Sequence, residues 1–414
     1  ILFYSNYKMF KYLRIASIYP IALEAYYKHH PKISRESYAT QYRHLMDQYL
    51  GLSDSYEKEL SSLGVLPHVI LVNAEPLQKT WAKENHINYQ SPRQVVFQQI
   101  LRFQPEVLWL NDTSLCDEHW LGELRNKVES LRLIIGNCCS PYNSFTLNLY
   151  KKCNFVLCCC QQLADELSQK GVSTHVVMHG FDETILSKVP QSNHSIKVLF
   201  TGSILAGDGF HQRRHELIEN LLQKDIDLTI YGAVKKEHYL LVRFKQILYK
   251  SFKWLEKKDK AHLLRNTWLH RRILSKNYPG YMSISHNMKK KIFPPKFGIE
   301  MFHLLQEADI CLNIHGDIAN KDAANMRLFE ATGMGSCLVT DWKANMCALF
   351  DDGSEVITYK DPQDCAEKIK WLLQHPEHRK RIAQAGQKKC LSQHSVKQRA
   401  KQLYDLIIQE LYKQ

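Results

Sequence analysis

Residues 310–341, ICLNIHGDIANKDAANMRLFEATGMGSCLVTD, contain the pattern that decides the fold class. An apolar run at 310–315 is followed by a polar loop, a helical stretch that begins near Asn325, two glycines, and a second apolar run at 337–341. Continuous apolar runs separated by a helix predict parallel strands that are buried on both faces of a sheet. The stretch therefore predicts one strand–helix–strand unit of an α/β domain.

The same alternation continues on both sides of this unit. In the first half of the chain, strands are expected at 13–19, 68–73, 107–111, 131–137, 155–160 and 174–180, and helices between them include 34–62, 92–103 and 161–170. After a polar linker at 187–195, strands are expected at 196–203, 227–232, 310–315, 337–341 and 355–359. A chain of 414 residues is also too long for one typical core. We therefore expect an α/β protein of two facing, doubly wound Rossmann-like domains, 1–190 and 191–395, with a C-terminal helix at 396–414 that packs back on the first domain.

The composition is that of a globular protein, with 44% hydrophobic and 23% charged residues. No apolar run approaches the roughly 18 residues that span a bilayer. The twelve cysteines include the neighbours Cys138–Cys139 and Cys158–Cys160, and neighbours in a strand point to opposite faces and do not pair easily. The cysteines therefore indicate a reducing, cytoplasmic location. A metal site is the rival interpretation, but no CxxC or His-x₃₋₅-His motif accompanies the cysteines, so none is predicted.

The net charge of +13 calls for an anionic partner, and much of it lies in a basic segment at 235–296 that interrupts the second domain. One interpretation is a solvated helical insert whose aromatic residues pack inward. Another is an amphipathic surface that rests on anionic lipid, which would place the protein at the inner face of a membrane. Nucleic-acid binding is not predicted, because no signature of it accompanies the charge.

The helix start near Asn325 has the features of an anion site. Its free N–H groups and the helix dipole favour negative charge, and Arg327 adds donors suited to phosphate. The carboxylate of Glu330 would suit the hydroxyls of a ribose. The same residues have plainer interpretations: Arg327 and Glu330 as a surface ion pair, Asp322 as a helix cap, and His315 as a buried histidine. Gly333 lets the backbone turn tightly or approach a ligand.

The segments NMRLFEATGMGSCLVTD (325–341), LFDDGSEVITY (349–359) and RIAQAGQKKCLSQHSVKQRA (381–400) resemble the C-terminal half of CgeB-like glycosyltransferases. These belong to the group 1 enzymes with two Rossmann-like domains, the GT-B fold. The resemblance covers about residues 196–413, and the first domain matches in architecture only. It implies a nucleoside diphosphate sugar as donor substrate, held by the second domain without a metal ion or other cofactor.

The resemblance also implies roles for single residues. Glu330 stands at the second position of the family's E-x₇-E motif, which holds the donor ribose, and Asp322 stands at the first, near the transferred sugar, as a shorter acid. Asn325 and Arg327 would lie by the diphosphate. Further candidates for the donor site are Gly202, Arg213, Arg214 and Gly333, and His315 joins Asp322 as a catalytic candidate. Arg213 and Arg214 could equally form a solvated pair at a helix start.

The function implied is transfer of a glycosyl group, with retention of configuration, to the hydroxyl of a glycan or lipid-linked acceptor in cell-surface polysaccharide or glycoconjugate synthesis. An inverting enzyme would need a base in the first domain, for which the candidates are Glu24, His29, His30 and Asp112. Two alternatives stay open. One is a nucleotide-sugar epimerase on the same fold, and the other is a binding or coat-assembly protein without catalytic activity.

Overall fold

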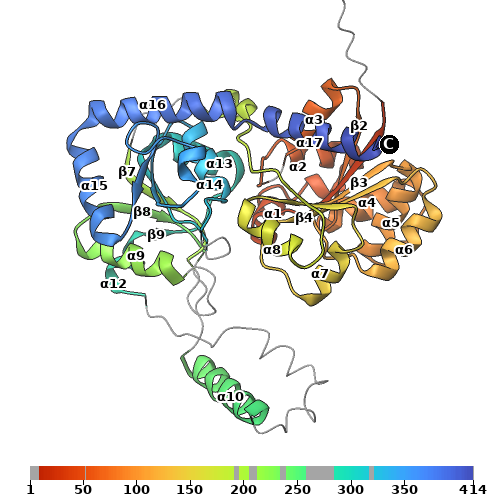
Figure 1. The fold of residues 1–414 in the computed structure, drawn as a ribbon, viewed down its shortest axis with the longest axis horizontal. Coiled ribbons are helices and arrows are strands. Elements are labelled where there is room, and N and C mark those ends of the chain that lie inside the picture. Colours follow the sequence, from red (N-terminus) through yellow and green to blue (C-terminus); the bar gives the residue numbers. More distant parts are fainter. Residues whose placement is uncertain are drawn as a thin grey trace, which may run out of the picture.

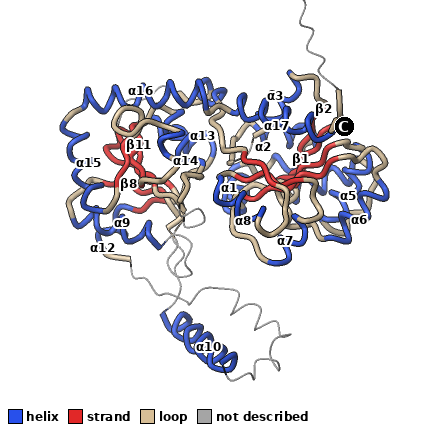
Figure 2. Tube along the Cα trace, in the orientation of Figure 1, coloured by secondary structure: helices blue, strands red, loops and turns tan. Residues whose placement is uncertain are grey.

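The computed structural model describes residues 9–413 except 52, 191–194, 205–211, 234–238, 258–283 and 317–320. It contains two six-stranded sheets, and each pair of neighbouring strands within them is parallel. Figure 1 shows the two sheets in two domains that lie side by side, and Figure 2 shows each sheet in red between layers of blue helices. The predicted fold class of two doubly wound α/β domains is confirmed.

The first sheet has the strand order β2-β1-β3-β4-β5-β6. Its strands are β1 (Lys11–Ala16), β2 (Leu66–Leu71), β3 (Val107–Leu110), β4 (Leu133–Cys138), β5 (Phe155–Cys158) and β6 (Thr174–Val176). Its helices are α1 (Pro20–His29), α2 (Tyr38–Met46), α3 (Ser55–Ser62), α4 (Glu75–Glu84), α5 (Pro92–Phe103), α6 (Glu118–Lys127), α7 (Ser144–Tyr150) and α8 (Gln161–Ser168). The chain order reverses between β1 and β3, so the carboxyl ends of these strands open onto the expected ligand crevice.

The sequence pattern at 34–62 predicts one long helix, and this is wrong. A short 3₁₀ turn precedes α2, and the chain then breaks between Met46 and Ser55. Within the break, Tyr49 and Gly51 have φ values of 53° and 77°. Left-handed backbone cannot continue a right-handed helix, so the stretch forms two helices that pack in different clusters, α2 through Leu45 and Met46 and α3 through Leu60.

The second sheet has the strand order β12-β11-β10-β7-β8-β9. Its strands are β7 (Ile196–Thr201), β8 (Leu228–Tyr231), β9 (Ile292–Phe293), β10 (Ala308–Asn313), β11 (Cys337–Asp341) and β12 (Ile357–Tyr359). Its helices are α9 (Gln212–Gln223), α12 (His286–Lys291), α13 (Gly298–Glu307), α14 (Met326–Gly333), α15 (Pro362–Gln374) and α16 (Pro376–Gln393). Successive residues of β7 show how both faces are covered: Phe200 packs with the α9 and α15 side chains, and Leu199 packs with those of α13 and α14.

The predicted basic insert is only partly an insert. Its last residues form α12 and the edge strand β9, which pairs with β8 as part of the sheet. Its first residues form α10 (Tyr239–Lys257), which Figure 1 shows apart from both sheets. The stretch 258–283 lies outside the described residues.

Two connections join the domains. In one, the segment after β6 forms a parallel bridge between Phe181 and Ser395, with Phe181 N donating to His394 O at 2.8 Å. In the other, α17 (Val396–Leu411) leaves the second domain, and its Leu403 and Ile407 pack among the buried residues of the first sheet. In Figure 1, α16 and α17 run across both domains. The two domains are therefore joined both by the Phe181–Ser395 bridge and by α17.

Candidate functional site

A cavity of about 240 Å³ lies between the two domains. Arg14, Trp109, Cys139 and His179 line it from the first domain, and Met326 and Glu330 line it from the second. The first-domain residues lie on or just beyond β1, β3, β4 and β6. Ligands of open α/β sheets bind at the carboxyl ends of the strands, so the cavity has the position expected of a substrate site.

Glu330 contributes a buried carboxylate to this cavity from α14. The residue is 9% exposed, and its Oε2 lies 2.9 Å from Nη1 of Arg327. The predicted i, i+3 ion pair therefore forms, but it is enclosed rather than on the surface. Arg327 engages Oε2, so Oε1 of Glu330 can accept hydrogen bonds from a ligand.

Arg327 turns away from the open side of the cavity. Its Nη2 lies 3.0 Å from the sulfur of Met301 on α13, and its Nε has no hydrogen-bond partner among the described residues. The guanidinium is thus held inside the second domain beside Glu330. Arg327 is linked to the predicted donor site by its ion pair with Glu330. The resemblance implies a direct contact between Arg327 and the diphosphate, and this contact stays a prediction.

Asn325 stands at the N-cap of α14 without capping it. Its amide Nδ2 donates to Oδ1 of Asn313 at 2.7 Å, and Nδ2 of Asn313 donates back to Oδ1 of Asn325 at 3.2 Å. This reciprocal pair joins the end of β10 to the start of α14. The first backbone N–H groups of α14 therefore keep their orientation toward the sheet edge, where they favour an anion.

His315, just after β10, belongs to a buried charge network. Its Nδ1 lies 2.7 Å from Oδ1 of Asp341, and Lys343 Nζ lies 3.2 Å from Oδ2 of the same carboxylate. Burial alone would raise the pKa of Asp341, but the hydrogen bond and charge of His315 and the charge of Lys343 outweigh it and lower the pKa to about 2. Asp341 engages Nδ1, and the other ring nitrogen, Nε2, is buried and has no hydrogen-bond partner among the described residues.

The network of His315, Asp341 and Lys343 predicts how the stability of the protein changes with pH. The pKa of Asp341 is lower in the folded protein than in the unfolded chain, so the unfolded state takes up more protons as the pH falls from about 4 to about 2. We expect Asp341 to contribute about 2 kcal/mol of stability at neutral pH, which is lost over that range. Urea unfolding from pH 6 to pH 3 should show a shallower fall in stability for Asp341→Asn than for the wild type. Parallel curves would contradict the assignment, and Asp405→Asn, on the exposed face of α17, is the control.

The two arginines at the start of α9 differ. Arg213 is exposed. Arg214 donates from Nη2 to Ile314 O at 3.1 Å and from Nη1 to Ser203 O at 3.2 Å. Its guanidinium therefore joins the carboxyl ends of β7 and β10 and places positive charge at the sheet edge. A Cβ on Gly232 would lie 2.4 Å from Gly202 O, so the close contact requires glycine at 232, and the role of Gly202 in the donor site stays a prediction.

Asp322 and Gly333 each contact a residue that is distant in the sequence, so the sequence pattern does not reveal these contacts. Oδ2 of Asp322 accepts a hydrogen bond from Gln162 N at 2.8 Å, so Asp322 caps α8 of the other domain. Asp322 is 8% exposed and does not line the cavity. A Cβ on Gly333 would lie 2.3 Å from Cγ of Phe181, so this glycine is required for packing at the domain junction. The catalytic and ligand-binding roles of the two residues stay predictions.

Several cavity residues were not found from the sequence. Arg14, in the middle of apolar β1, is 4% exposed, and its Nη2 lies 2.7 Å from Oε2 of Glu57. Its guanidinium lies 5.4 Å from the ring centre of Trp109. Burial raises the pKa of Glu57 above its usual value, although the Arg14 charge opposes this. A single arginine within an apolar strand is the signal that could have identified this pair.

Tyr19, at the start of α1, faces the same gap. Its ring is accessible to solvent, yet both domains surround it, and this partial enclosure raises its pKa. The charge of Glu330 adds to the rise, and the charges of Arg327 and Arg214 oppose it.

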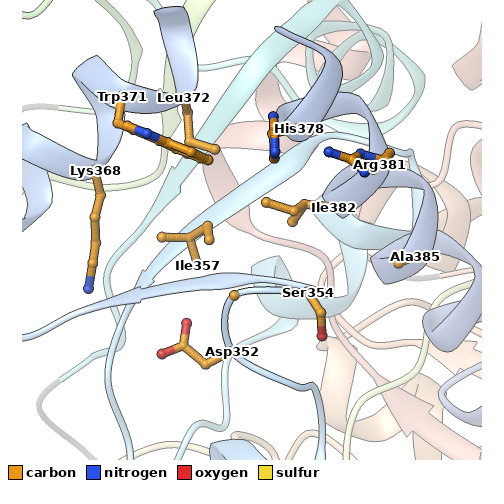
Figure 3. A pocket seen from close by; sticks show the side chains of 11 residues that line it. Asp352, Ser354, Ile357, Lys368, Trp371, Leu372, His378, Arg381, Ile382 and Ala385 are labelled. Carbon is orange, nitrogen blue, oxygen red and sulfur yellow. The ribbon is translucent and has the colours of Figure 1, made fainter. Parts of the chain in front are cut away.

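A larger hollow, about 750 Å³, lies elsewhere on the second domain. Figure 3 shows Lys368, Trp371, His378 and Arg381 around it, on the α15 and α16 side. One residue that lines this hollow, Ile357, lies at the amino end of the edge strand β12. Because this is the opposite edge from the one where open α/β sheets bind ligands, the smaller interdomain cavity is the better candidate.

Comparisons with known proteins agree with this geometry. Residues 213–405 match the model of a family described as glycosyl transferase-like. No curated protein matches the sequence. The resemblance to the CgeB-like branch in particular stays a prediction.

Solved structures resemble the whole chain. Anabaena HepE in complex with UDP and glucose is 12% identical, with a TM-score of 0.53 over 96% of this chain and 99% of that one. A glycosyltransferase from Rickettsia africae is 10% identical, with a TM-score of 0.53 over 98% and 100%. Sucrose-phosphate synthase from Thermosynechococcus elongatus is 10% identical, with a TM-score of 0.52 over 98% and 100%. At these identities the structures show the shared fold.

The family match covers α9, the predicted donor residues of α14, and most of α17, and the structural matches extend the fold to both domains. Residues 213–405 are therefore similar to the glycosyl transferase-like family, and the two-domain α/β fold of the whole chain is the one seen in these solved structures.

Proposed function

We propose that the protein transfers a glycosyl group from a nucleoside diphosphate sugar to an acceptor hydroxyl, with retention of configuration. The observation that carries the proposal is the position of Glu330, a buried carboxylate that lines the interdomain cavity one turn after the start of α14. A carboxylate with one oxygen outside the ion pair with Arg327 suits the vicinal hydroxyls of a ribose. The helix start in front of it suits the diphosphate.

The donor side of the site is the second domain. The N–H groups of α14 and the charge of Arg214 lie at the sheet edge, where they stabilise the negative charge that develops on the leaving diphosphate. In the reaction, the bond from the anomeric carbon to the diphosphate oxygen breaks, and a bond to the acceptor oxygen forms. The acceptor proton passes to the leaving diphosphate. These protein groups supply the neutralising charge, so no metal ion is needed to hold the donor.

The acceptor side is the first domain. Trp109 and Tyr56 line the cavity beside the Arg14–Glu57 pair, and aromatic faces with a few polar groups suit a sugar ring. A glycan or lipid-linked acceptor in cell-surface polysaccharide or glycoconjugate synthesis fits this chemistry. The role of His315 as a donor-side catalytic residue is part of the proposal; its contact with Asp341 supports a fixed ring orientation.

A donor panel tests the proposal. The purified protein is incubated with uridine, guanosine, cytidine and adenosine diphosphate sugars, with and without glycan acceptors, and released nucleotide and new glycoside are both measured. We expect one donor to raise the melting temperature and to release its nucleoside diphosphate faster with an acceptor. Rearrangement of the sugar without an acceptor would indicate the epimerase alternative. Neither nucleotide release nor a shift in melting temperature with any donor would contradict the proposal.

We also propose that α10 places the protein on an anionic membrane surface. Leu240, Phe244, Ile247 and Trp254 follow one face of this helix and are each more than half exposed. Basic side chains flank them at Arg243, Lys245 and Lys250. Among the described residues, no helix is long and apolar enough to cross a bilayer, so the interaction would be peripheral.

Binding to lipid vesicles tests the proposed interaction of α10 with an anionic membrane. We expect the protein to sediment with vesicles that contain phosphatidylserine at low salt and to be released by high salt. Replacing Arg243, Lys245 and Lys250 together by Gln should weaken binding about 100-fold, since each charge near the surface contributes about 1 kcal/mol. Equal binding to neutral vesicles, or binding unchanged by the triple substitution, would contradict it.

A further inference from the structure

Three metal-binding side chains meet beside the interdomain cavity. The sulfurs of Cys139 and Cys159 and one imidazole nitrogen of His179 all lie within 4.8 Å of one another. Cys159 is 3% exposed, whereas Cys139 and His179 are partly exposed and line the cavity. The glycosyl transfer proposed above uses none of the three.

The fold explains how residues so far apart in the chain come together. β4, β5 and β6 are parallel neighbours in register, with Cys138 beside Cys158 and Cys158 beside Val176. Cys139 and Cys159 are the first residues after β4 and β5, and His179 is the third residue after β6. Because the carboxyl ends of parallel strands meet at one edge, the sheet itself assembles the cluster.

The backbone of His179 is fixed by the domain junction. Arg399 Nε donates to His179 O at 3.1 Å, and a Cβ on the next residue, Gly180, would lie 2.9 Å from Ser395 O. On the other side, Nδ2 of Asn137 approaches the sulfur of Cys139 at 3.8 Å. The backbone of His179 is therefore held at the domain junction, and the side chain of Cys139 is held by Asn137, which favours a preorganised metal site.

We propose that Cys139, Cys159 and His179 bind one zinc-class divalent transition metal ion, with a fourth coordination position open to the cavity. Two thiolates and one imidazole are the ligands that Zn²⁺ prefers, and three protein ligands with one open position are the pattern of a reactive rather than a purely structural zinc site. The contact with Cys139, together with burial, raises the pKa of the Cys159 thiol, and a bound cation would favour the thiolate instead.

The site differs from a structural zinc motif, which explains why spacing alone did not predict it. The ligands are twenty residues apart in each step, 139, 159 and 179, and no CxxC pair is involved. Cys139 and His179 line the same cavity as Glu330, from the other domain. If the transferase activity holds, the ion would contact an oxygen of the acceptor; metal binding itself does not depend on that activity.

The test uses the purified full chain after metal removal under reducing conditions. We expect Co²⁺ to bind at one ion per chain with a thiolate-to-cobalt absorption band and intense visible bands, and Zn²⁺ to displace it. Cys139→Ser, Cys159→Ser and His179→Gln should each weaken Zn²⁺ binding more than about 100-fold, since even loss of an outer-shell partner costs 10–100-fold. Cys347→Ser, at an exposed cysteine away from the cluster, is the matched control and should bind like the wild type.

Several results would overturn the proposal. They are the absence of the thiolate band, equal binding by the three ligand variants and the control, or a Cys139–Cys159 disulfide that forms in air and is unaffected by Zn²⁺. If a ligand variant fails to fold, X-ray absorption at the zinc edge of the wild type decides the question. We expect two sulfurs at about 2.3 Å and one nitrogen at about 2.0 Å, and a shell of oxygen alone would contradict the site.

Discussion

Replacing Glu330 by Gln is expected to weaken nucleoside diphosphate binding about 10- to 100-fold. The substitution keeps the shape of the side chain but removes the charge from the oxygen that faces the cavity. A hydrogen bond to a charged group contributes about 1.5–3 kcal/mol, which corresponds to this loss. Calorimetric titration with UDP, followed by the other nucleoside diphosphates, measures the effect directly.

Glu330→Gln also removes the ion-pair partner of Arg327. The effect of the substitution on stability therefore has to be distinguished from its effect on nucleotide binding. Arg327 is about 15% exposed in its side chain, and an unpaired buried charge destabilises a protein by about 3 kcal/mol or more. In the double variant Arg327→Met with Glu330→Gln, no buried charge is left unpaired. We expect the double variant to recover stability but not nucleotide binding. Recovery of both would show that Glu330 is structural.

Replacing Gly333 by Ala is expected to destabilise the protein by about 3 kcal/mol. The new Cβ would lie 2.3 Å from Cγ and 2.5 Å from Cδ1 of Phe181, whose ring is 1% exposed. Such contacts are more than 1 Å too close, and a core at native density cannot open by that amount without strain. Urea unfolding monitored by circular dichroism gives the difference in stability.

Two further variants make the prediction specific. Phe181→Leu in the Gly333→Ala background removes the ring and should restore part of the lost stability. Gly122→Ala is the control, because Gly122 lies within α6 and a Cβ there meets nothing within 4 Å, so stability should stay unchanged or rise slightly. A neutral effect of Gly333→Ala, or an equal effect at both glycines, would show that Gly333 does not pack as described.

Much of the fold could be predicted from the sequence because its strands are continuous apolar runs. β11 begins and ends where predicted, at Cys337 and Asp341, and most other strands differ at their ends only. β9 was missed because two residues, Ile292 and Phe293, carry no pattern of their own and pair only when the sheet is formed. The helix at 34–62 was overextended because left-handed backbone at Tyr49 leaves no signal in hydrophobic spacing.

The candidate site was less predictable, since its contacts span long distances in the chain. The position of Glu330 on the cavity could be anticipated from the helix that carries it. The bond from Gln162 to Asp322 joins two domains across 160 residues, and no local pattern contains it. The packing of Gly333 on Phe181 is equally remote in sequence. Local spacing motifs do not reveal which cysteines lie close together, because the order of the strands in the sheet decides this.

The central claim is that a donor nucleotide lies on α14 with its ribose against Glu330. Titration of the wild type and Glu330→Gln with UDP and with 2′,3′-dideoxy-UDP tests it most directly. We predict that the wild type binds UDP at least about tenfold more tightly than the dideoxy form, and that Glu330→Gln binds the two alike. A wild type that does not distinguish them, or a Glu330→Gln variant that keeps the full preference, would contradict the claim.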